Sequence, residues 1–162
     1  MLVRWPAKIK AGVISTEIVS MEHWVATLMA AVGEPDIKEK LLKGHEASGK
    51  TFKVHLDSYN LIPLLTGEEE KGPRVEFLYW NDGVQLVGLR YHDWKMVFME
   101  QREHGFDVWT EPMITLRFPK IFNLRRDPFE RAFKESNFYH GWWVNHFFLT
   151  VPTQTYVREC IA

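Results

Sequence analysis

Three strand-like segments separated by two tight-turn signals constrain the fold of this 162-residue chain more than any other feature. The segments span residues 75–80, 84–91 and 94–99, and each is rich in β-branched and aromatic residues. Asp82-Gly83 is a strong hairpin signal between the first two, and His92-Asp93 joins the second to the third. Because such short connections join only neighbouring antiparallel strands, the stretch predicts an antiparallel meander.

The rest of the C-terminal half adds one strand and a set of helices. KIFNL, residues 120–124, predicts a fourth short strand, and Asp127-Pro128-Phe129-Glu130 has the composition of a helix start. Residues 137–162 are strongly aromatic and are expected to be helical, with an interruption near Pro152. The predicted fold class is therefore α+β, with a small antiparallel sheet of about four strands packed against helices.

The N-terminal third reads as a short strand followed by helices. LVRW, residues 2–5, predicts a strand that stops at Pro6. Apolar residues then recur at spacings of three and four from Ile18 to Val32, which is typical of an amphipathic helix. A second helix is expected from Pro35 to just before Gly44, and a short helix follows Asn60, which can cap it.

The stretch GHEASGKT, Gly44 to Thr51, fits the G-x-x-x-x-G-K-[ST] pattern of a phosphate-binding P-loop. A P-loop needs a buried strand before it and a helix that begins at its Lys-Thr. Here a predicted helix precedes the motif, and the alternation of Phe52, Val54 and Leu56 predicts a strand after it. Since the order is reversed, a solvated loop is favoured and no bound nucleotide is expected.

Composition narrows the functional classes. The formal net charge is −1, so no basic field favours nucleic acid as a partner. No apolar run approaches the roughly 18 residues of a membrane helix, and the first residues lack the apolar core of a signal peptide, so the chain is expected to be soluble. The single cysteine, Cys160, cannot form a disulfide within the chain and does not discriminate between redox compartments.

No catalytic, cofactor-binding or metal-ligating residue is predicted. His140 and His146 are six residues apart, and no H-x-x-x-H or C-x-x-C occurs, so surface or hydrogen-bonded roles are favoured for all seven histidines. There is no G-x-S-x-G nucleophile elbow, and Glu68-Glu69-Glu70 is a charge run typical of a solvated loop. An aromatic cluster favours core packing over a sugar or lipid platform; it comprises Phe138, Tyr139, Trp142, Trp143, Phe147 and Phe148.

Six segments, in order and at matching spacing, resemble the C-terminal part of a bacterial arylsulfatase: VRWPAKIKAG, EIVSMEHWVATLMAAVGEPDI, KVHLDSYNLIPLLTG, PRVEFLYWNDG, LRYHDWKMVFMEQ and KIFNLRRDPFERA. The resemblance implies an alkaline-phosphatase-like fold, in which a large α/β domain precedes a smaller C-terminal antiparallel sheet. Residues 1–51 would then be the tail of the large catalytic domain, and residues 52–162 the C-terminal subdomain with its aromatic helix.

The resemblance also implies a chemistry that this sequence does not carry. The family hydrolyses sulfate esters with a formylglycine made within C-x-P-S-R, beside a calcium ion. No C-x-P-S-R occurs here, and the family's metal-binding and sulfate-binding residues would lie upstream of Met1. The chain is therefore expected to be a fragment of a sulfuric ester hydrolase, inactive alone, with the missing catalytic domain or a second copy as its partner. Localisation stays open, although full-length relatives are often periplasmic or secreted.

Two residues depart from the family pattern, and one alternative function remains. His23 and Ala26 stand where relatives usually have Asp and Pro, which is expected to weaken that helix start by about 1 kcal/mol. The alternative is a stand-alone interaction module that docks a partner chain through the aromatic helix or through the LVRW strand as an exposed edge.

Overall fold

The computed structural model describes the backbone of residues 1–161 and the side chains of residues 1–159. The chain divides into two compact units, Met1–Val75 and Glu76–Ala162, which we call unit 1 and unit 2. Each is described by itself below. The domain boundary expected between residues 51 and 52 rests on the family resemblance and stays a prediction. None of the helices within residues 1–161 is long and apolar enough to cross a bilayer.

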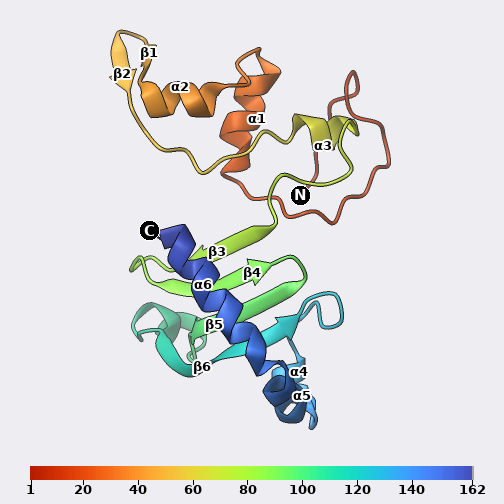
Figure 1. Cartoon of the computed structure of the whole chain (residues 1–162), viewed down its shortest axis with the longest axis vertical. Helices are drawn as coiled ribbons and strands as arrows, with labels where there is room; N and C mark the ends of the chain where they lie inside the picture. The colour runs from red at the N-terminus through yellow and green to blue at the C-terminus, as the bar shows by residue number, and fades with distance from the viewer. Residues whose placement is uncertain (162) are drawn as a thin grey trace. The chain divides into compact units, whose positions relative to one another are not determined.

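Unit 1 consists of short helices and one small hairpin (Figure 1). Its elements, in chain order, are α1 (His23–Ala31), α2 (Ile37–Lys43), β1 (His45–Ala47), β2 (Lys50–Phe52) and α3 (Ile62–Thr66). Gly33, Gly44 and Gly67 follow the three helices with positive φ angles, as expected for residues that end helices.

Two predictions for the first 23 residues of unit 1 are wrong. Residues 2–5, all of which the structure describes, form no strand, and the Leu2 side chain is fully exposed. The first helix begins at His23 rather than at Ile18. The backbone N–H of Ser20 donates to His23 Nδ1 at 3.2 Å, and the Ser20 hydroxyl donates to the Glu22 carboxylate. These bonds hold the residues before His23 in a non-helical conformation, although their apolar spacing matches a helix.

Buried hydroxyl groups fasten α1 to the segment that leads into α3. Ser58 Oγ donates to the carbonyl of Glu22 at 2.7 Å and accepts from the backbone N–H of Ala26 at 3.2 Å. Thr27 Oγ1 donates to the His23 carbonyl at 2.7 Å and accepts from the N–H of Leu61 at 3.0 Å. The Ala26 bond uses a backbone N–H that a proline at this position would lack.

Unit 2 contains the predicted antiparallel sheet, in the order β3-β4-β5-β6. Its strands are β3 (Glu76–Trp80), β4 (Leu86–Tyr91), β5 (Trp94–Glu100) and β6 (Ile114–Asn123). The three-strand meander is confirmed, with His92-Asp93 as a two-residue turn between Tyr91 and Trp94. The fourth strand is longer than predicted. Pro119 lies within it, which an edge strand such as β6 tolerates.

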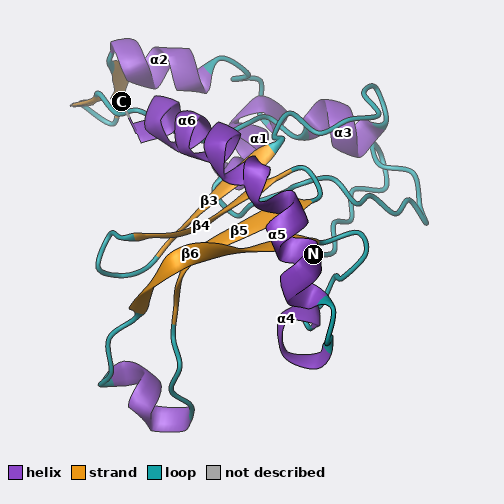
Figure 2. Cartoon of the chain, turned by 60° about the horizontal axis from the view of Figure 1, so that its bottom comes forward, coloured by secondary structure: helices purple, strands orange, loops and turns teal. Residues whose placement is uncertain are grey.

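Helices cover one face of this sheet (Figures 1 and 2). They are α4 (Ala132–Glu135), α5 (Tyr139–His146), the 3-10 turn η2 (Phe147–Leu149) and α6 (Thr150–Ile161). Thr153 of α6 contacts Met96 of β5, Oγ1 to Sδ, at 2.8 Å, and Trp142 of α5 stacks on Trp94 with ring centroids 6.2 Å apart. The α+β class with a four-stranded sheet packed against helices is therefore confirmed. The helical interruption occurs at Phe147–Leu149, just before Pro152.

One helix-start prediction for unit 2 is wrong, and the predicted Asp82-Gly83 hairpin is confirmed with a left-handed residue after the turn. Asp127 does not start a helix at once, because α4 begins only at Ala132; the Asp127 carboxylate instead accepts from the N–H groups of Arg131 at 3.0 Å and Ala132 at 2.8 Å. In the β3–β4 hairpin the positive φ, 58°, belongs to Val84 and not to Gly83. The connection is thus a turn at Asp82-Gly83 followed by a left-handed residue, which is a three-residue loop. A further 3-10 turn, η1 (Gly105–Trp109), lies in the β5–β6 connection.

Candidate functional site

The P-loop-like stretch forms a β-hairpin. Ala47 of β1 pairs with Lys50 of β2, and Ser48 and Gly49 between them both have positive φ angles, 51° and 75°. This is the backbone of a two-residue hairpin turn. Lys50 and Thr51 therefore lie in a strand and do not begin a helix, and the alternating strand predicted from Phe52 onward ends at Phe52. The absence of a bound nucleotide stays a prediction.

The histidines are dispersed over both units. Three of them, His55, His92 and His104, lie in loops or turns, two lie in α5 and His45 lies in β1, whereas His23 is completely buried in unit 1. Among residues 1–159, no three His, Cys, Asp or Glu side chains lie close enough together to hold a metal ion. The predictions of no catalytic, cofactor-binding or metal residue remain predictions. The Cys160 side chain lies outside the described part of the chain.

A charged cluster with a buried arginine and two carboxylates that are at least partly exposed surrounds the buried His23 in unit 1. Arg74, only 5% exposed, donates from Nε to His23 Nε2 at 2.7 Å and from its Nη2 to Asp57 Oδ1 at 2.9 Å. Its Nη2 also lies 3.5 Å from the Glu22 carboxylate. The guanidinium is thus neutralised by two carboxylates, which a buried arginine requires. A sequence pattern could not reveal the cluster because its members come from positions 22, 23, 57 and 74.

The His23 ring is held in its neutral form. Burial lowers its pKa from the ordinary value of 6.5, and the neighbouring Arg74 charge lowers it further, while Glu22 and Asp57 oppose the shift. Nδ1 faces the N–H of Ser20 and Nε2 faces Arg74, so both nitrogens meet donors. The neutral ring carries one proton, so only one of its nitrogens can accept a hydrogen bond, and a second proton would add a repulsive contact with a donor. Unit 1 therefore contains a buried neutral imidazole beside Arg74.

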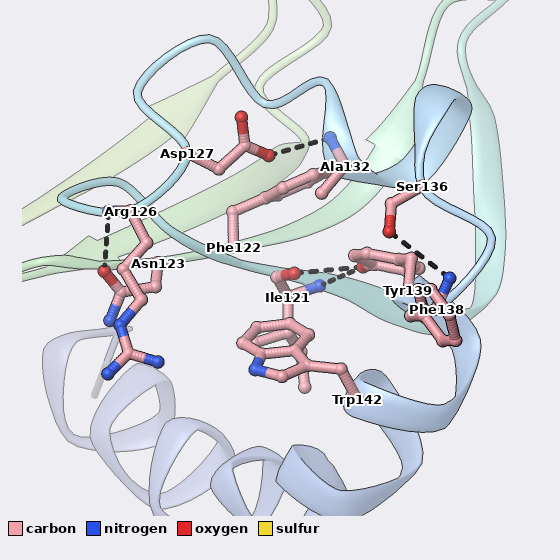
Figure 3. A pocket seen from close by; sticks show the side chains of 10 residues that line it. All are labelled: Ile121, Phe122, Asn123, Arg126, Asp127, Ala132, Ser136, Phe138, Tyr139 and Trp142. Atoms are coloured by element: carbon pink, nitrogen blue, oxygen red, sulfur yellow. Dashed lines mark hydrogen bonds between the residues drawn. The ribbon is translucent and has the colours of Figure 1, made fainter.

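Unit 2 contains a cavity of about 340 Å³, shown in Figure 3. It lies between the end of β6, the loop that follows it and the first turns of α5. Apolar and aromatic side chains predominate in its lining, which consists of Ile121, Phe122, Asn123, Arg126, Asp127, Ala132, Ser136, Phe138, Tyr139 and Trp142. The volume falls in the range of small-ligand sites in proteins, roughly 300–1,000 Å³.

Hydrogen bonds fix the cavity wall. The Tyr139 hydroxyl accepts from the N–H of Ile121 at 3.1 Å and donates to its carbonyl at 2.9 Å, so it bridges both backbone groups of that residue (Figure 3). Burial raises the pKa of Tyr139 above 10.0, although the bond to Ile121 opposes the shift. The phenol therefore stays protonated at physiological pH, and its hydroxyl has a structural hydrogen-bonding role rather than that of a base.

Two donors at this cavity have no protein partner. The Arg126 guanidinium and the indole N–H of Trp142 make no hydrogen bond or ion pair with any described residue. Figure 3 shows both on the same side of the cavity, with the Asp127 carboxylate at the opposite end. Both Asp127 oxygens accept backbone N–H groups. The cavity thus combines an aromatic lining with cationic and neutral donors at one end.

The aromatic cluster has the core role that the sequence favoured. Tyr139 is buried, Trp142 stacks on Trp94, and Trp143 Nε1 donates to the carbonyl of Pro119 at 2.9 Å. Phe138 and Phe148, in contrast, are largely exposed. The sequence did not indicate the cavity. The available signal was the proximity of Arg125-Arg126-Asp127 to the aromatic run, but only the chain reversal between β6 and α5 brings the two together.

Among the comparisons with known proteins, only the one with solved structures finds similar chains, and the likeness is distant. No protein-family model matches the chain, and no curated protein matches it. Among solved structures, the chain is similar to the PsFucS1 sulfatase from Pseudoalteromonas sp., with 17% sequence identity and a TM-score of 0.41. The match covers 65% of this chain and 21% of the sulfatase, so the chain spans about a fifth of that protein.

Proposed function

We propose that the chain is the C-terminal portion of an arylsulfatase-like sulfuric ester hydrolase and is non-catalytic alone. The observation that carries this proposal is the four-stranded antiparallel sheet with helices on one face. The family resemblance implies such a sheet for residues 52–162. Residues 1–51 would belong to the catalytic domain, and that domain or a second copy of the chain would be the partner.

Three of the six segments that carry the resemblance contribute strands and turns to unit 2. PRVEFLYWNDG supplies β3 and its turn, LRYHDWKMVFMEQ supplies the end of β4 and all of β5, and KIFNLRRDPFERA supplies the end of β6 and the Asp127 turn. The residues shared with the family therefore specify strands, turns and packing. They supply no nucleophile, in keeping with a supporting rather than a catalytic part of an enzyme.

Sulfate-ester hydrolysis makes demands that the described clusters do not meet. It needs an activated oxygen nucleophile and cations that stabilise the sulfate oxygens. The unit 1 cluster commits its one arginine to two carboxylates, and its histidine is buried. In the family the missing groups are formylglycine and calcium, which would be contributed by the catalytic domain.

The first test is turnover by the purified chain on 4-nitrophenyl sulfate, with and without added calcium. We expect no hydrolysis above the uncatalysed rate. Saturable hydrolysis that copurifies with the chain would contradict the proposal. The second test is the DNA sequence 5′ of the Met1 codon. An in-frame C-x-P-S-R with sulfatase-like sequence would support the proposal, whereas an unrelated sequence would contradict it.

One feature favours the second candidate, a module that docks a partner chain. Phe106 and Trp109 on η1 are 90% and 85% exposed, and Val108 beside them is partly exposed. Exposed aromatic residues are common at protein interfaces. The LVRW segment does not support this candidate, since it forms no strand. A monomer in analytical ultracentrifugation whose behaviour is identical to that of Phe106→Ser would contradict self-association through η1.

A further inference from the structure

From the cavity of unit 2 we infer a binding site for a small aromatic anion, such as an aryl sulfonate, aryl sulfate or aryl carboxylate. The aromatic body would lie against the rings of Phe122, Tyr139 and Trp142, and the acidic group would meet Arg126. The inference depends on the chemistry of the lining and not on the proposed function. It assigns the site to reversible binding, with no chemical step.

The ring-lined part of the cavity is rigid before any ligand arrives. Tyr139 is fixed by its two bonds to Ile121, and Phe133 contacts the Tyr139 ring edge-on with centroids 5.4 Å apart. Trp142 stacks on His146 at 4.3 Å, and the His146 ring nitrogen Nδ1 lies 2.7 Å from the Trp142 carbonyl. Side chains locked in this way lose little entropy when a flat molecule binds.

The donor end of the cavity selects for negative charge. Arg126 brings a guanidinium with five N–H donors, and Trp142 brings an indole N–H that can only donate. Neither group has a partner among the described residues, and both lie at the same end of the cavity (Figure 3). A planar or tetrahedral oxyanion accepts from both kinds of donor, and guanidinium pairs well with such groups.

Asp127 does not cancel this preference. Its carboxylate lies at the opposite end of the cavity, and both of its oxygens accept backbone N–H groups, from Arg131 and Ala132. Those bonds disperse its charge. A basic or neutral ligand would find no free acceptor beside Arg126, so the polar lining favours an anion over a cation of the same size.

The experiment is a titration of the full chain with 2-naphthalenesulfonate. Binding is measured by calorimetry and by the shifts of the indole N–H signals in ¹H–¹⁵N spectra. We expect saturable 1:1 binding that shifts one indole N–H signal. That signal should be absent from the spectrum of Trp142→Phe, which identifies it as Trp142. The uncharged analogue 2-naphthylmethanol should bind about tenfold more weakly, because it cannot form the charge-assisted bonds. Arg126→Gln should weaken sulfonate binding by about the same factor.

The matched control is Arg125→Gln. Arg125 is the adjacent arginine and is exposed, as Arg126 is, but it does not line the cavity, so its loss should change sulfonate affinity less than about twofold. If both arginine variants lost the same sulfonate affinity, the effect would come from overall positive charge and not from the cavity, and the inference would be overturned. The absence of saturable binding, or equal affinity for the sulfonate and the alcohol, would overturn it as well.

Discussion

Unit 1 and unit 2 have differently composed interiors. In unit 2 two buried residues, Thr150 and Thr153, are polar, and the others are apolar or aromatic residues of the sheet and its covering helix: Leu89, Met96, Met99, Ile121, Phe122 and Tyr139. In unit 1 apolar Ala26, Ile37 and Leu61 share the interior with four polar residues, His23, Thr27, Ser58 and Arg74. Unit 2 thus depends on packing of apolar surface, whereas unit 1 depends on a set of hydrogen bonds that must all be satisfied.

The difference teaches where each unit is vulnerable. Apolar packing loses stability in proportion to the volume removed, and neighbouring side chains can relax. A buried polar network fails more abruptly, because removal of one member leaves its partners without hydrogen bonds in a place that water does not reach. Substitutions in the two units should therefore act through different mechanisms, and each should act on its own unit.

The largest effect is expected for Ile121→Ala in β6. Ile121 is fully buried, and its removal leaves a void beneath the Tyr139 bridge. We expect the free energy of unfolding of unit 2 to fall by about 4 kcal/mol. Hydrogen exchange of amides in β4 and β5 measures this loss. The control is Ile114→Ala on the same strand, where the side chain is partly exposed and the loss should stay below about 1 kcal/mol.

Arg74→Met should lower the free energy of unfolding of unit 1 by about 2 kcal/mol, because the hydrogen bonds of a charged donor are lost. Methionine retains much of the side-chain volume, but it leaves His23 Nε2 without its donor and Asp57 and Glu22 without their cation. Exchange of the α1 amides should accelerate, while that of β4 and β5 should not change. A uniform loss across both units would remove the contrast between them.

Arg102→Met supplies the matched control for that experiment. Arg102 is exposed and pairs with Glu100, so its removal should cost less than about 1 kcal/mol. If the two arginine variants had equal effects, burial of the cluster would not be the source of the stabilisation.

The same contrast explains which parts of the fold could be predicted from sequence. The strands of unit 2 follow period-two patterns between turn residues, and these signals are local, so residues 75–99 were predicted closely. The interior of unit 1 rests on bonds between residues 32 to 51 positions apart, such as Ala26–Ser58 and His23–Arg74. No local pattern reports such a bond, and the helical spacing before His23 was therefore misleading. The unit 2 cavity was missed for the same reason, since its donor end and its rings come from separate segments.

Acidification should lower the free energy of unfolding of unit 1, by less than the Arg74 substitution does. The pKa of His23 in the folded chain is lowered from 6.5, so below about pH 6.5 the unfolded chain binds the proton more readily than the folded one. The stabilisation is fully present above that pH and is lost as the pH falls toward the lower folded pKa. Hydrogen exchange of the α1 amides, corrected for intrinsic rates, should therefore give a smaller free energy of opening at about pH 5.5 than at about pH 7.5.

His23→Gln provides the control for the pH experiment. Glutamine can accept from Arg74 but has no proton to gain in this range. Unit 1 of this variant should lose the His23 part of its pH dependence. An unchanged slope would mean that other groups produce the effect, and the His23 cluster would then not be the acid-sensitive element.

The smallest effect is a gain expected for Val84→Asn in the β3–β4 hairpin. Val84 has φ 58°, a left-handed conformation that strains a β-branched residue, and its side chain is exposed, so little packing is lost by the substitution. Asparagine tolerates this conformation, and unit 2 should be stabilised by about 1 kcal/mol in denaturant unfolding.

Gly83→Ala tests which residue of the hairpin has the left-handed conformation. If the left-handed residue were Gly83, as in the two-residue turn that Asp-Gly favours, alanine would be destabilising by about 1 kcal/mol. Because the structure places that conformation one residue later, at Val84, Gly83→Ala should leave the stability of unit 2 nearly unchanged. A destabilisation by Gly83→Ala as large as the stabilisation by Val84→Asn would instead show that the hairpin has a two-residue turn with Gly83 left-handed.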